Sequence, residues 1–240
     1  MSTTLFFIRK TKALFIRFQL HRLVEPFSGF LLNLAYLSKI SKWAHENRKI
    51  SFNDFYSNKW DYEKRFGLYK HLNNLQGADK QITYLEFGVS QGHSFKWWVA
   101  NNKNEHSVFC GFDTFEGLPE DWGMFKAGAM STHNAIPQID GNRHKFIKGL
   151  FQQTLPDFIK AHDLSGPLVL HLDADLYSST LYVLTSLAPH LKSGDILIFD
   201  EFSVPKHEFL AYTNFIQSYY LQFELIAAAN NYFFTAFRMK

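Results

Sequence analysis

The chain has 240 residues, 46% of them hydrophobic and 18% aromatic, which is enough for one domain with a substantial core and an additional arm. A single cysteine, Cys110, excludes an intrachain disulfide and is typical of a protein from a reducing compartment. Residues 1–50 carry nine of the 25 Lys and Arg and only two acidic residues. The rest of the chain is therefore net acidic, and no nucleic-acid groove is expected.

The N-terminal segment, residues 1–58, is predicted to be a basic helical arm that precedes a domain over residues 59–240. Helices are expected over residues 3–22 and 28–47, and the first resembles a basic amphipathic helix on an anionic membrane surface. The apolar stretch 26–38 is too short for a membrane span of about 20 residues. We therefore expect a cytoplasmic protein, peripheral to the inner face of the membrane if the arm binds lipid. The alternative is a helix packed on its own domain or on a partner subunit of a homo-oligomer.

After the arm, helical and strand-like segments alternate. The expected helices cover residues 61–75, 94–101, 155–162, 179–191 and 206–220, and the expected strands cover 82–88, 107–113, 145–148, 168–173 and 195–200. Two further strand-like runs, 223–228 and 232–238, are separated by a turn with two asparagines that predicts a hairpin. The alternation predicts an α/β fold with a doubly wound, mostly parallel, seven-stranded sheet closed by a C-terminal antiparallel hairpin.

A turn bracketed by glycines follows the first strand of the sheet. Gly88 and Gly92 enclose it, and a helix begins after it, so backbone N–H groups and a helix N-terminus face any ligand there. The G-x-x-x-G spacing differs from the G-x-G-x-x-G of nicotinamide-binding folds. Glu86 suits a ligand with an ammonium and a sulfonium group, so the pattern favours S-adenosylmethionine. A purely steric role of the glycines is the alternative.

An aspartate ends the second strand, 21 residues after Gly92. In doubly wound folds an acidic residue about 20 residues after the glycine turn accepts hydrogen bonds from ribose hydroxyls, which is the role predicted for Asp113. The alternative is an aspartate that caps or holds the turn before Thr114.

Acidic residues also end the fourth and fifth strands. Asp173 and Asp175 follow the fourth strand, and Asp200 and Glu201 follow the fifth, at the edge where ligands bind in open α/β sheets. Carboxylates that converge there repel one another unless they are protonated or bridged by a cation, and Mg²⁺ is the simplest such cation. It would lower the pKa of a bound hydroxyl, whose oxyanion could then attack a methyl group. The alternative is that Asp175 caps the next helix and Asp200 orients cofactor or substrate.

Two other features bear on catalysis. His207, just after the fifth-strand acids, is a candidate general base, with a surface histidine as the alternative. The segment 116–143 lacks periodicity and is expected to form part of a lid over the substrate, with a surface loop as the alternative.

Five short motifs occur in one order along the chain. They are Glu86-Phe87-Gly88-Val89 with Gly92, Phe112-Asp113-Thr114-Phe115-Glu116-Gly117-Leu118-Pro119, Gly149-Leu150-Phe151 before Thr154-Leu155-Pro156, Leu172-Asp173-Ala174-Asp175-Leu176-Tyr177, and Phe199-Asp200-Glu201. Together they resemble the macrocin O-methyltransferase type of class I S-adenosylmethionine-dependent methyltransferases. The resemblance covers about residues 60–220 and leaves the arm outside it.

The resemblance implies a Rossmann-like methyltransferase fold and methyl transfer to a hydroxyl of a sugar, with Mg²⁺ at the strand ends. Its metal positions fall on Asp173, Asp200 and Glu201, although the family usually has two adjacent aspartates at the last pair. Its cofactor positions fall on Glu86, Gly88, Gly92 and Asp113, with Phe151 near the adenine. The acceptor-binding segments do not match recognisably.

The leading hypothesis is an O-methyltransferase that uses S-adenosylmethionine and Mg²⁺ to methylate a glycosyl or other hydroxylated small molecule, including a lipid-linked sugar. Asp173, Asp200 and His207 are its predicted catalytic residues. Two alternatives remain open at this point: a nicotinamide-dependent oxidoreductase, and a non-catalytic protein that binds S-adenosylmethionine.

Overall fold

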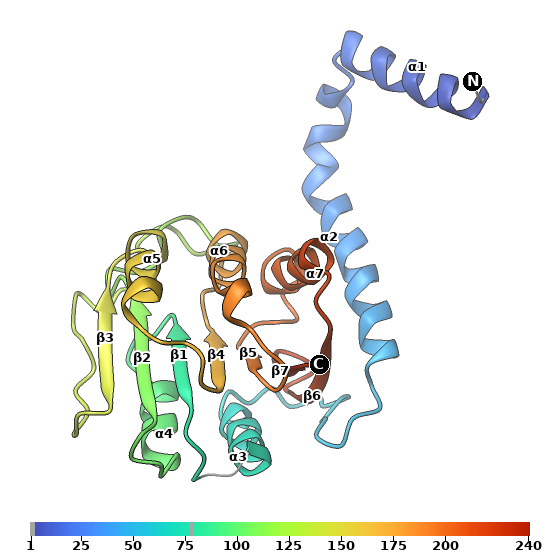
Figure 1. The fold of residues 1–240 in the computed structure, drawn as a ribbon. Helices are drawn as coiled ribbons and strands as arrows, with labels where there is room; N and C mark the ends of the chain where they lie inside the picture. The colour runs from blue at the N-terminus through green and yellow to red at the C-terminus, as the bar shows by residue number, and fades with distance from the viewer. Residues whose placement is uncertain (1–2, 77–78) are drawn as a thin grey trace. The chain divides into compact units, whose positions relative to one another are not determined.

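The computed structural model describes residues 3–76 and 79–240 (Figure 1). The chain forms two compact units that divide between Lys42 and Trp43, whereas the sequence placed the start of the sheet domain at residue 59. The sheet unit begins earlier because the Trp43 ring packs against Phe202 and Tyr232, with centroid distances of 4.8 and 5.7 Å. Farther on, Asn53 pairs with Ala228 in an isolated β-bridge, which ties this segment to the sheet.

The first unit contains the two helices predicted for the arm. α1 (Thr3–Arg17) ends before the predicted residue 22 because the chain turns at Gln19, whose φ is 50°. α2 (His21–Glu46) begins earlier than predicted and continues through Pro26 into the second unit. Neither these two helices nor any other helix in the described residues has the length and hydropathy needed to cross a membrane.

The described part of the second unit forms one seven-stranded sheet in the order β3-β2-β1-β4-β5-β7-β6. Its strands are β1 (Thr83–Phe87), β2 (Val108–Asp113), β3 (His144–Lys148), β4 (Leu168–Leu172), β5 (Ile196–Phe199), β6 (Phe223–Ala229) and β7 (Phe234–Met239). The first five strands are parallel, and β7 runs antiparallel to both β5 and β6. The predicted fold class is confirmed.

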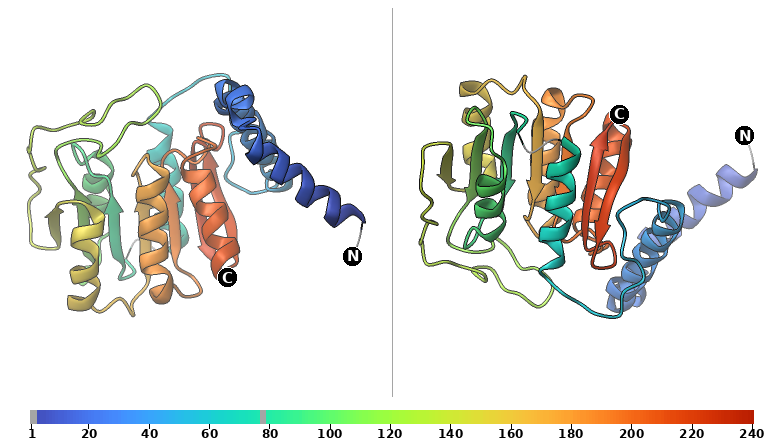
Figure 2. Two further views of the ribbon diagram at one scale, coloured as in Figure 1. Left: turned by 90° about the horizontal axis from the view of Figure 1, so that it is seen from above. Right: turned by 90° about the horizontal axis from the view of Figure 1, so that it is seen from below.

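Helices cover both faces of the sheet. They are α3 (Lys64–Gln76), α4 (His93–Asn101), α5 (Phe151–Ala161), α6 (Tyr177–Leu187) with the 3₁₀ turn η1 (Ala188–His190), and α7 (Glu208–Tyr219). α3 and α4 lie on one face, and α5, α6 and α7 lie on the other (Figure 2). The hairpin turn lies at residues 230–233, and both Asn230 and Asn231 have the positive φ that the sequence predicted, 55° and 60°.

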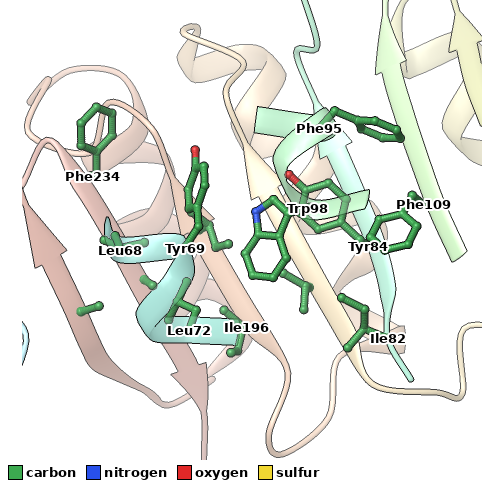
Figure 3. Packing of buried hydrophobic residues seen from close by; sticks show 14 of the residues in the cluster. Leu68, Tyr69, Leu72, Ile82, Tyr84, Phe95, Trp98, Phe109, Ile196 and Phe234 are labelled. Carbon is green, nitrogen blue, oxygen red and sulfur yellow. The ribbon is translucent and has the colours of Figure 1, made fainter. Parts of the chain in front are cut away.

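The core between the sheet and the helices α3 and α4 consists largely of aromatic side chains (Figure 3). Tyr84 on β1 stacks on Trp98 of α4 at 5.3 Å, and Phe95 and Phe109 pack around the Tyr84 ring. All four side chains are fully buried. Because parallel strands are covered on both faces, they can consist of continuous apolar runs, as all five buried residues of β4 illustrate.

The substitution Phe109→Ala tests this core. We expect it to lower the free energy of unfolding by about 3–5 kcal/mol, because it removes a fully buried ring and leaves a cavity. Phe125→Ala, at a ring that is 41% exposed, should cost less than about 1.5 kcal/mol in the same urea denaturation experiment. Equal losses for the two variants would contradict this description of the core.

Candidate active site

A cavity of about 450 Å³ lies at the carboxyl ends of the parallel strands, where the strand order reverses between β1 and β4. Six of the residues predicted for the site line it: Glu86, Gly88, Asp113, Phe151, Asp173 and Glu201. The predicted residues Gly92, Asp200 and His207 are not among its lining residues. The loop predicted as a lid contributes Gly117, Leu118, Pro119 and Met130 to the lining.

The turn after β1 needs glycine for steric reasons. Gly88 has φ 93°, and a Cβ there would lie 1.8 Å from the carbonyl oxygen of Asp173, so the ends of β1 and β4 approach too closely for a side chain. Gly92 has φ 74°, and a Cβ there would lie 2.9 Å from Pro137. The same turn leads into α4, whose residues His93 and Ser94 line the cavity. The geometry therefore supports the steric role of both glycines, and Gly88 also lines the cavity.

Asp113 holds this turn. Its Oδ2 accepts hydrogen bonds from the backbone N–H groups of Val89 and Ser90, at 2.7 and 2.8 Å, and its Oδ1 accepts one from Phe115 at 2.7 Å. A carboxylate has about four lone-pair sites, so three are already engaged. The structure therefore gives Asp113 the turn-holding role that was the alternative interpretation, although its side chain still lines the cavity.

Behind the cavity, a buried histidine lies between two carboxylates. Glu86 and His171 are register partners on β1 and β4, and His171 Nδ1 lies 3.4 Å from Glu86 Oε2 and 2.8 Å from the Tyr84 hydroxyl. His171 Nε2 lies 3.7 Å from Asp200 Oδ1. Burial alone would lower the pKa of His171, but the carboxylates of Asp200 and Glu86 outweigh it and raise this pKa to about 10. This shift favours the protonated, positively charged ring at neutral pH.

α3 and the residues just before it complete the surroundings of Asp200. The hydroxyls of Tyr62 and Tyr69 donate to its two oxygens at 3.4 and 3.3 Å, and Arg65 Nη1 lies 3.8 Å from Oδ2. None of these three residues was predicted from the sequence. Their spacing could have indicated that they act together, because residues at i, i+3 and i+7 fall on one side of a helix.

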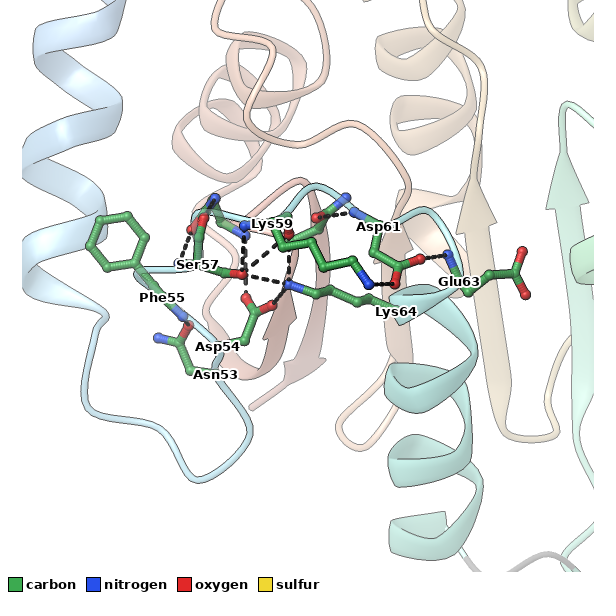
Figure 4. Close-up of polar contacts among 10 residues, drawn as sticks. Asn53, Asp54, Phe55, Ser57, Lys59, Asp61, Glu63 and Lys64 are labelled. Carbon is green, nitrogen blue, oxygen red and sulfur yellow. Dashed lines mark hydrogen bonds and ion pairs between the residues drawn. The ribbon is translucent and has the colours of Figure 1, made fainter.

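The loop that leads into α3 is fixed by its own polar contacts (Figure 4). Lys64 Nζ donates to Asp54 Oδ2 and to Ser57 Oγ, at 2.6 and 2.8 Å. The backbone N–H of Ser57 donates to Asn231 Oδ1 at 2.8 Å, which anchors the loop to the C-terminal hairpin turn. The hairpin thereby fixes the start of α3 and the position of Tyr62.

Few positively charged groups in the described ranges lie near the two remaining acidic residues, Asp173 and Glu201. Burial, together with Asp200 and Asp175, raises the pKa of Asp173 well above its ordinary value, and burial with Asp175 and Glu208 raises that of Glu201 to about 11. Among the described residues, Glu201 Oε2 has no hydrogen-bond partner. Ligand atoms of His171, Asp173 and Asp200 lie within 4.8 Å of one another, whereas Glu201 is not part of that group. The structure thus brings two of the three predicted metal ligands together.

Two sequence interpretations are not supported by the geometry. His207 Nδ1 accepts a 3.4 Å hydrogen bond from the backbone of Tyr177, and its ring packs edge-on against Trp122, so it lies outside the cavity. Asp175 does not cap the next helix, because Leu176 is the N-cap residue of α6 and no side chain bonds there. The Asp175 carboxyl instead lies beside Glu201, which contributes to its hydrogen bonding.

The family model described as Macrocin-O-methyltransferase (TylF) matches residues 84–233, well over half of the chain and every strand-end residue of this cavity. The chain belongs to the macrocin O-methyltransferase family. This methyltransferase is 32% identical over 111 residues to the 8-demethyl-8-(2,3-dimethoxy-α-L-rhamnosyl)-tetracenomycin-C 4′-O-methyltransferase of Streptomyces olivaceus. That alignment covers 38% of the chain and 41% of the relative, so it spans less than half of the relative's length.

Solved structures show the same fold. The calicheamicin methyltransferase CalS11 superposes with a TM-score of 0.59 at 20% identity, and the O-methyltransferase NovP superposes with a TM-score of 0.56 at 18% identity. Each comparison covers 73% of this methyltransferase and 79% of the other chain. The sequence resemblance to the family is confirmed.

The buried imidazolium makes the stability of this methyltransferase depend on pH. The folded-state pKa of His171, about 10, lies above the ordinary value of 6.5, so its contribution is fully present below pH 6.5 and is lost as the pH rises toward 10. A difference of this size corresponds to about 4–5 kcal/mol. We expect His171→Gln to remove most of the decline in unfolding free energy between neutral pH and pH 10, measured by urea denaturation.

The exposed His106 provides the control, because His106→Gln should keep the wild-type pH dependence. A pH dependence that is the same in His171→Gln as in the wild type would show that the buried ring is not charged.

Proposed function

We propose that this methyltransferase transfers a methyl group from S-adenosylmethionine to a hydroxyl of a sugar or another hydroxylated small molecule. The family description supports transfer to oxygen. The name of the Streptomyces olivaceus relative, a 4′-O-methyltransferase of a rhamnosyl-tetracenomycin, supports a glycosyl acceptor. The single observation that carries the proposal is one cavity at the topological switch point in which a glycine turn faces a set of carboxylates.

The cavity suits the cofactor in size and charge. Its volume of about 450 Å³ is in the range of small-molecule sites, about 300–1,000 Å³. Tyr84 and His171 engage only Oε2 of Glu86, so its other carboxylate oxygen can accept from the ammonium group of the methionine moiety. The first N–H groups of α4 have no partner within the helix and favour the methionine carboxylate. Phe151, which lines the same cavity, provides an apolar surface for the adenine.

The acidic strand ends fit a hard divalent cation such as Mg²⁺. Asp173 and Asp200 offer neighbouring oxygens, and the buried Glu201 Oε2 is without a partner among the described residues. Asp173, Asp200 and Glu201 would hold the cation, although Glu201 has to turn away from Asp175 to do so. When bound, the cation supplies Lewis acidity that lowers the pKa of the acceptor hydroxyl.

The chain's own groups have distinct roles in this proposal. Arg65 and His171 hold Asp200 in place from behind, as outer-shell partners do at metal sites. Asp173 lines the cavity and is partly exposed, so it is the carboxylate that contacts the acceptor hydroxyl. Leu118, Pro119 and Met130 from the loop over the cavity exclude water during transfer. Because His207 does not line the cavity, this proposal assigns it no role as a base.

Of the two alternative functions, family membership gives no support to a nicotinamide-dependent oxidoreductase. A non-catalytic protein that binds S-adenosylmethionine is distinguished by turnover. Transfer of a labelled methyl group to a panel of free sugars, nucleotide sugars and glycosides would exclude it, whereas cofactor binding without transfer to any of them would favour it.

Calorimetric titration tests the cofactor and the cation separately. We expect S-adenosylmethionine to bind the wild type, and Mg²⁺ to give a further heat that Asp173→Ala/Asp200→Ala abolishes, with an affinity loss of more than about 100-fold because two ligands are removed. The matched control is Asp157→Ala/Asp163→Ala, which removes two exposed carboxylates and should behave as the wild type. Cofactor binding without a Mg²⁺ heat would overturn the metal assignment alone. Absence of cofactor binding would overturn the proposed function.

A further inference from the structure

The N-terminal unit exposes an unusual amount of apolar surface. Of the 28 large apolar side chains that are exposed in the described residues, 16 lie between Leu5 and Leu37. Only Ile40 is buried in α1 and α2 together. Exposed apolar surface of this extent marks an interaction site in a soluble chain. The segment Thr3–Lys42, called the basic arm below, is therefore built to contact something outside its own unit.

The cations of α1 all lie on one half of the helix, opposite a stripe of apolar residues. With 100° between successive residues, an apolar stripe about 120° wide contains Phe7, Ile8, Leu14 and Phe15 and is continued by Phe18. The exposed fractions in this stripe range from 40% at Phe15 to 71% at Phe7. All four cations of the helix, Arg9, Lys10, Lys12 and Arg17, lie on the opposite half. This arrangement is that of an interfacial helix.

The exposed part of α2 continues the apolar surface, most of it within a stretch that carries no charge. Leu23, Phe27, Phe30 and Leu34 are spaced by four, three and four residues and are each more than half exposed. The uncharged stretch 26–38 is about 20 Å long as a helix, shorter than the roughly 30 Å of a bilayer's hydrocarbon core. It can therefore enter a membrane surface without crossing the membrane.

The charge of the basic arm identifies its partner. It carries seven Lys and Arg against a single acid, Glu25, so two copies of it repel each other, whereas a negatively charged surface attracts it. We propose that the basic arm binds the surface of an anionic lipid bilayer, with the stripe of α1 inserted at the boundary of headgroups and acyl chains and the cations at the lipid phosphates. Leu5, Phe6 and Ile16, which are exposed on the cationic half, fit a lipid surface better than a narrow helix–helix seam.

Co-sedimentation with vesicles tests this proposal on the full chain, without reference to methyl transfer. The wild type should pellet with phosphatidylcholine vesicles that contain phosphatidylglycerol and not with vesicles of phosphatidylcholine alone, and high salt should weaken the binding. Lys10→Glu/Lys12→Glu/Arg17→Glu should reduce partitioning by at least about 100-fold, since each cation near an anionic surface contributes about a factor of five. Phe7→Ser/Phe15→Ser/Phe18→Ser should reduce it as well, with the cations intact.

The matched control is Lys70→Glu/Lys103→Glu/Lys160→Glu, which changes the net charge equally at exposed positions of the sheet unit and should bind as the wild type does. Absence of pelleting with anionic vesicles, or equal loss in the control, would overturn the proposal. So would a dimer in size-exclusion chromatography with light scattering that the Phe→Ser variant dissociates while vesicle binding is absent. That result would assign the arm to subunit contact.

Discussion

The carboxyl edge of the sheet depends on one electrostatic requirement: two buried carboxylates need a buried cation. Glu86 and Asp200 are 1% and 0% exposed, and an ionised carboxylate in such a place is costly unless it is paired. His171 meets this requirement from β4, the strand that lies between β1 and β5 in the sheet. The pairing therefore spans three adjacent strands, and it fixes the strand ends from which the cavity is built.

The same requirement separates the acids into two groups. Glu86 and Asp200 are neutralised from behind by His171 and Arg65, so their positions are set by the protein alone. In the described part of the chain neither Asp173 nor Glu201 forms an ion pair of this kind, and burial together with the neighbouring carboxylates raises their pKa values. In the proposed site, Asp200 is thus held in place by the protein's own cations, whereas Asp173 and Glu201 obtain countercharge from the bound cation.

Much of this could be predicted from the sequence because parallel strands deliver their ends to one edge. The strands and the acidic residues at their ends follow local sequence patterns. Four predicted residues therefore line the cavity as expected: Glu86, Gly88, Asp173 and Glu201. The sequence did not predict the contacts that Asp200 makes with Tyr62, Arg65 and Tyr69. These contacts depend on where α3, a helix outside the β–α alternation, packs against the sheet. His207 was predicted to be a base because it is close to the fifth-strand acids in the sequence. Two tight turns follow β5, however, and they direct His207 away from the cavity. In these turns Val204 N–H donates to Glu201 O, and His207 N–H donates to Val204 O. Asp113 was placed correctly, yet its bonding to the turn requires three-dimensional contacts that spacing does not give.

The loop before α3 makes the surroundings of Asp200 depend on a turn that is far away in the sequence. Its contacts to Asn230 and Asn231 join residues 53–61 to the last hairpin of the chain. Tyr62 and Arg65, which contact Asp200 from that end of α3, are thus held by residues that lie 174 and 169 positions away from their partners in the sequence. The strand ends of the cavity, by contrast, are held by direct pairing of β1, β4 and β5. The α3 side of the cavity therefore depends on contacts between distant parts of the chain, whereas its strand side depends on neighbouring strands.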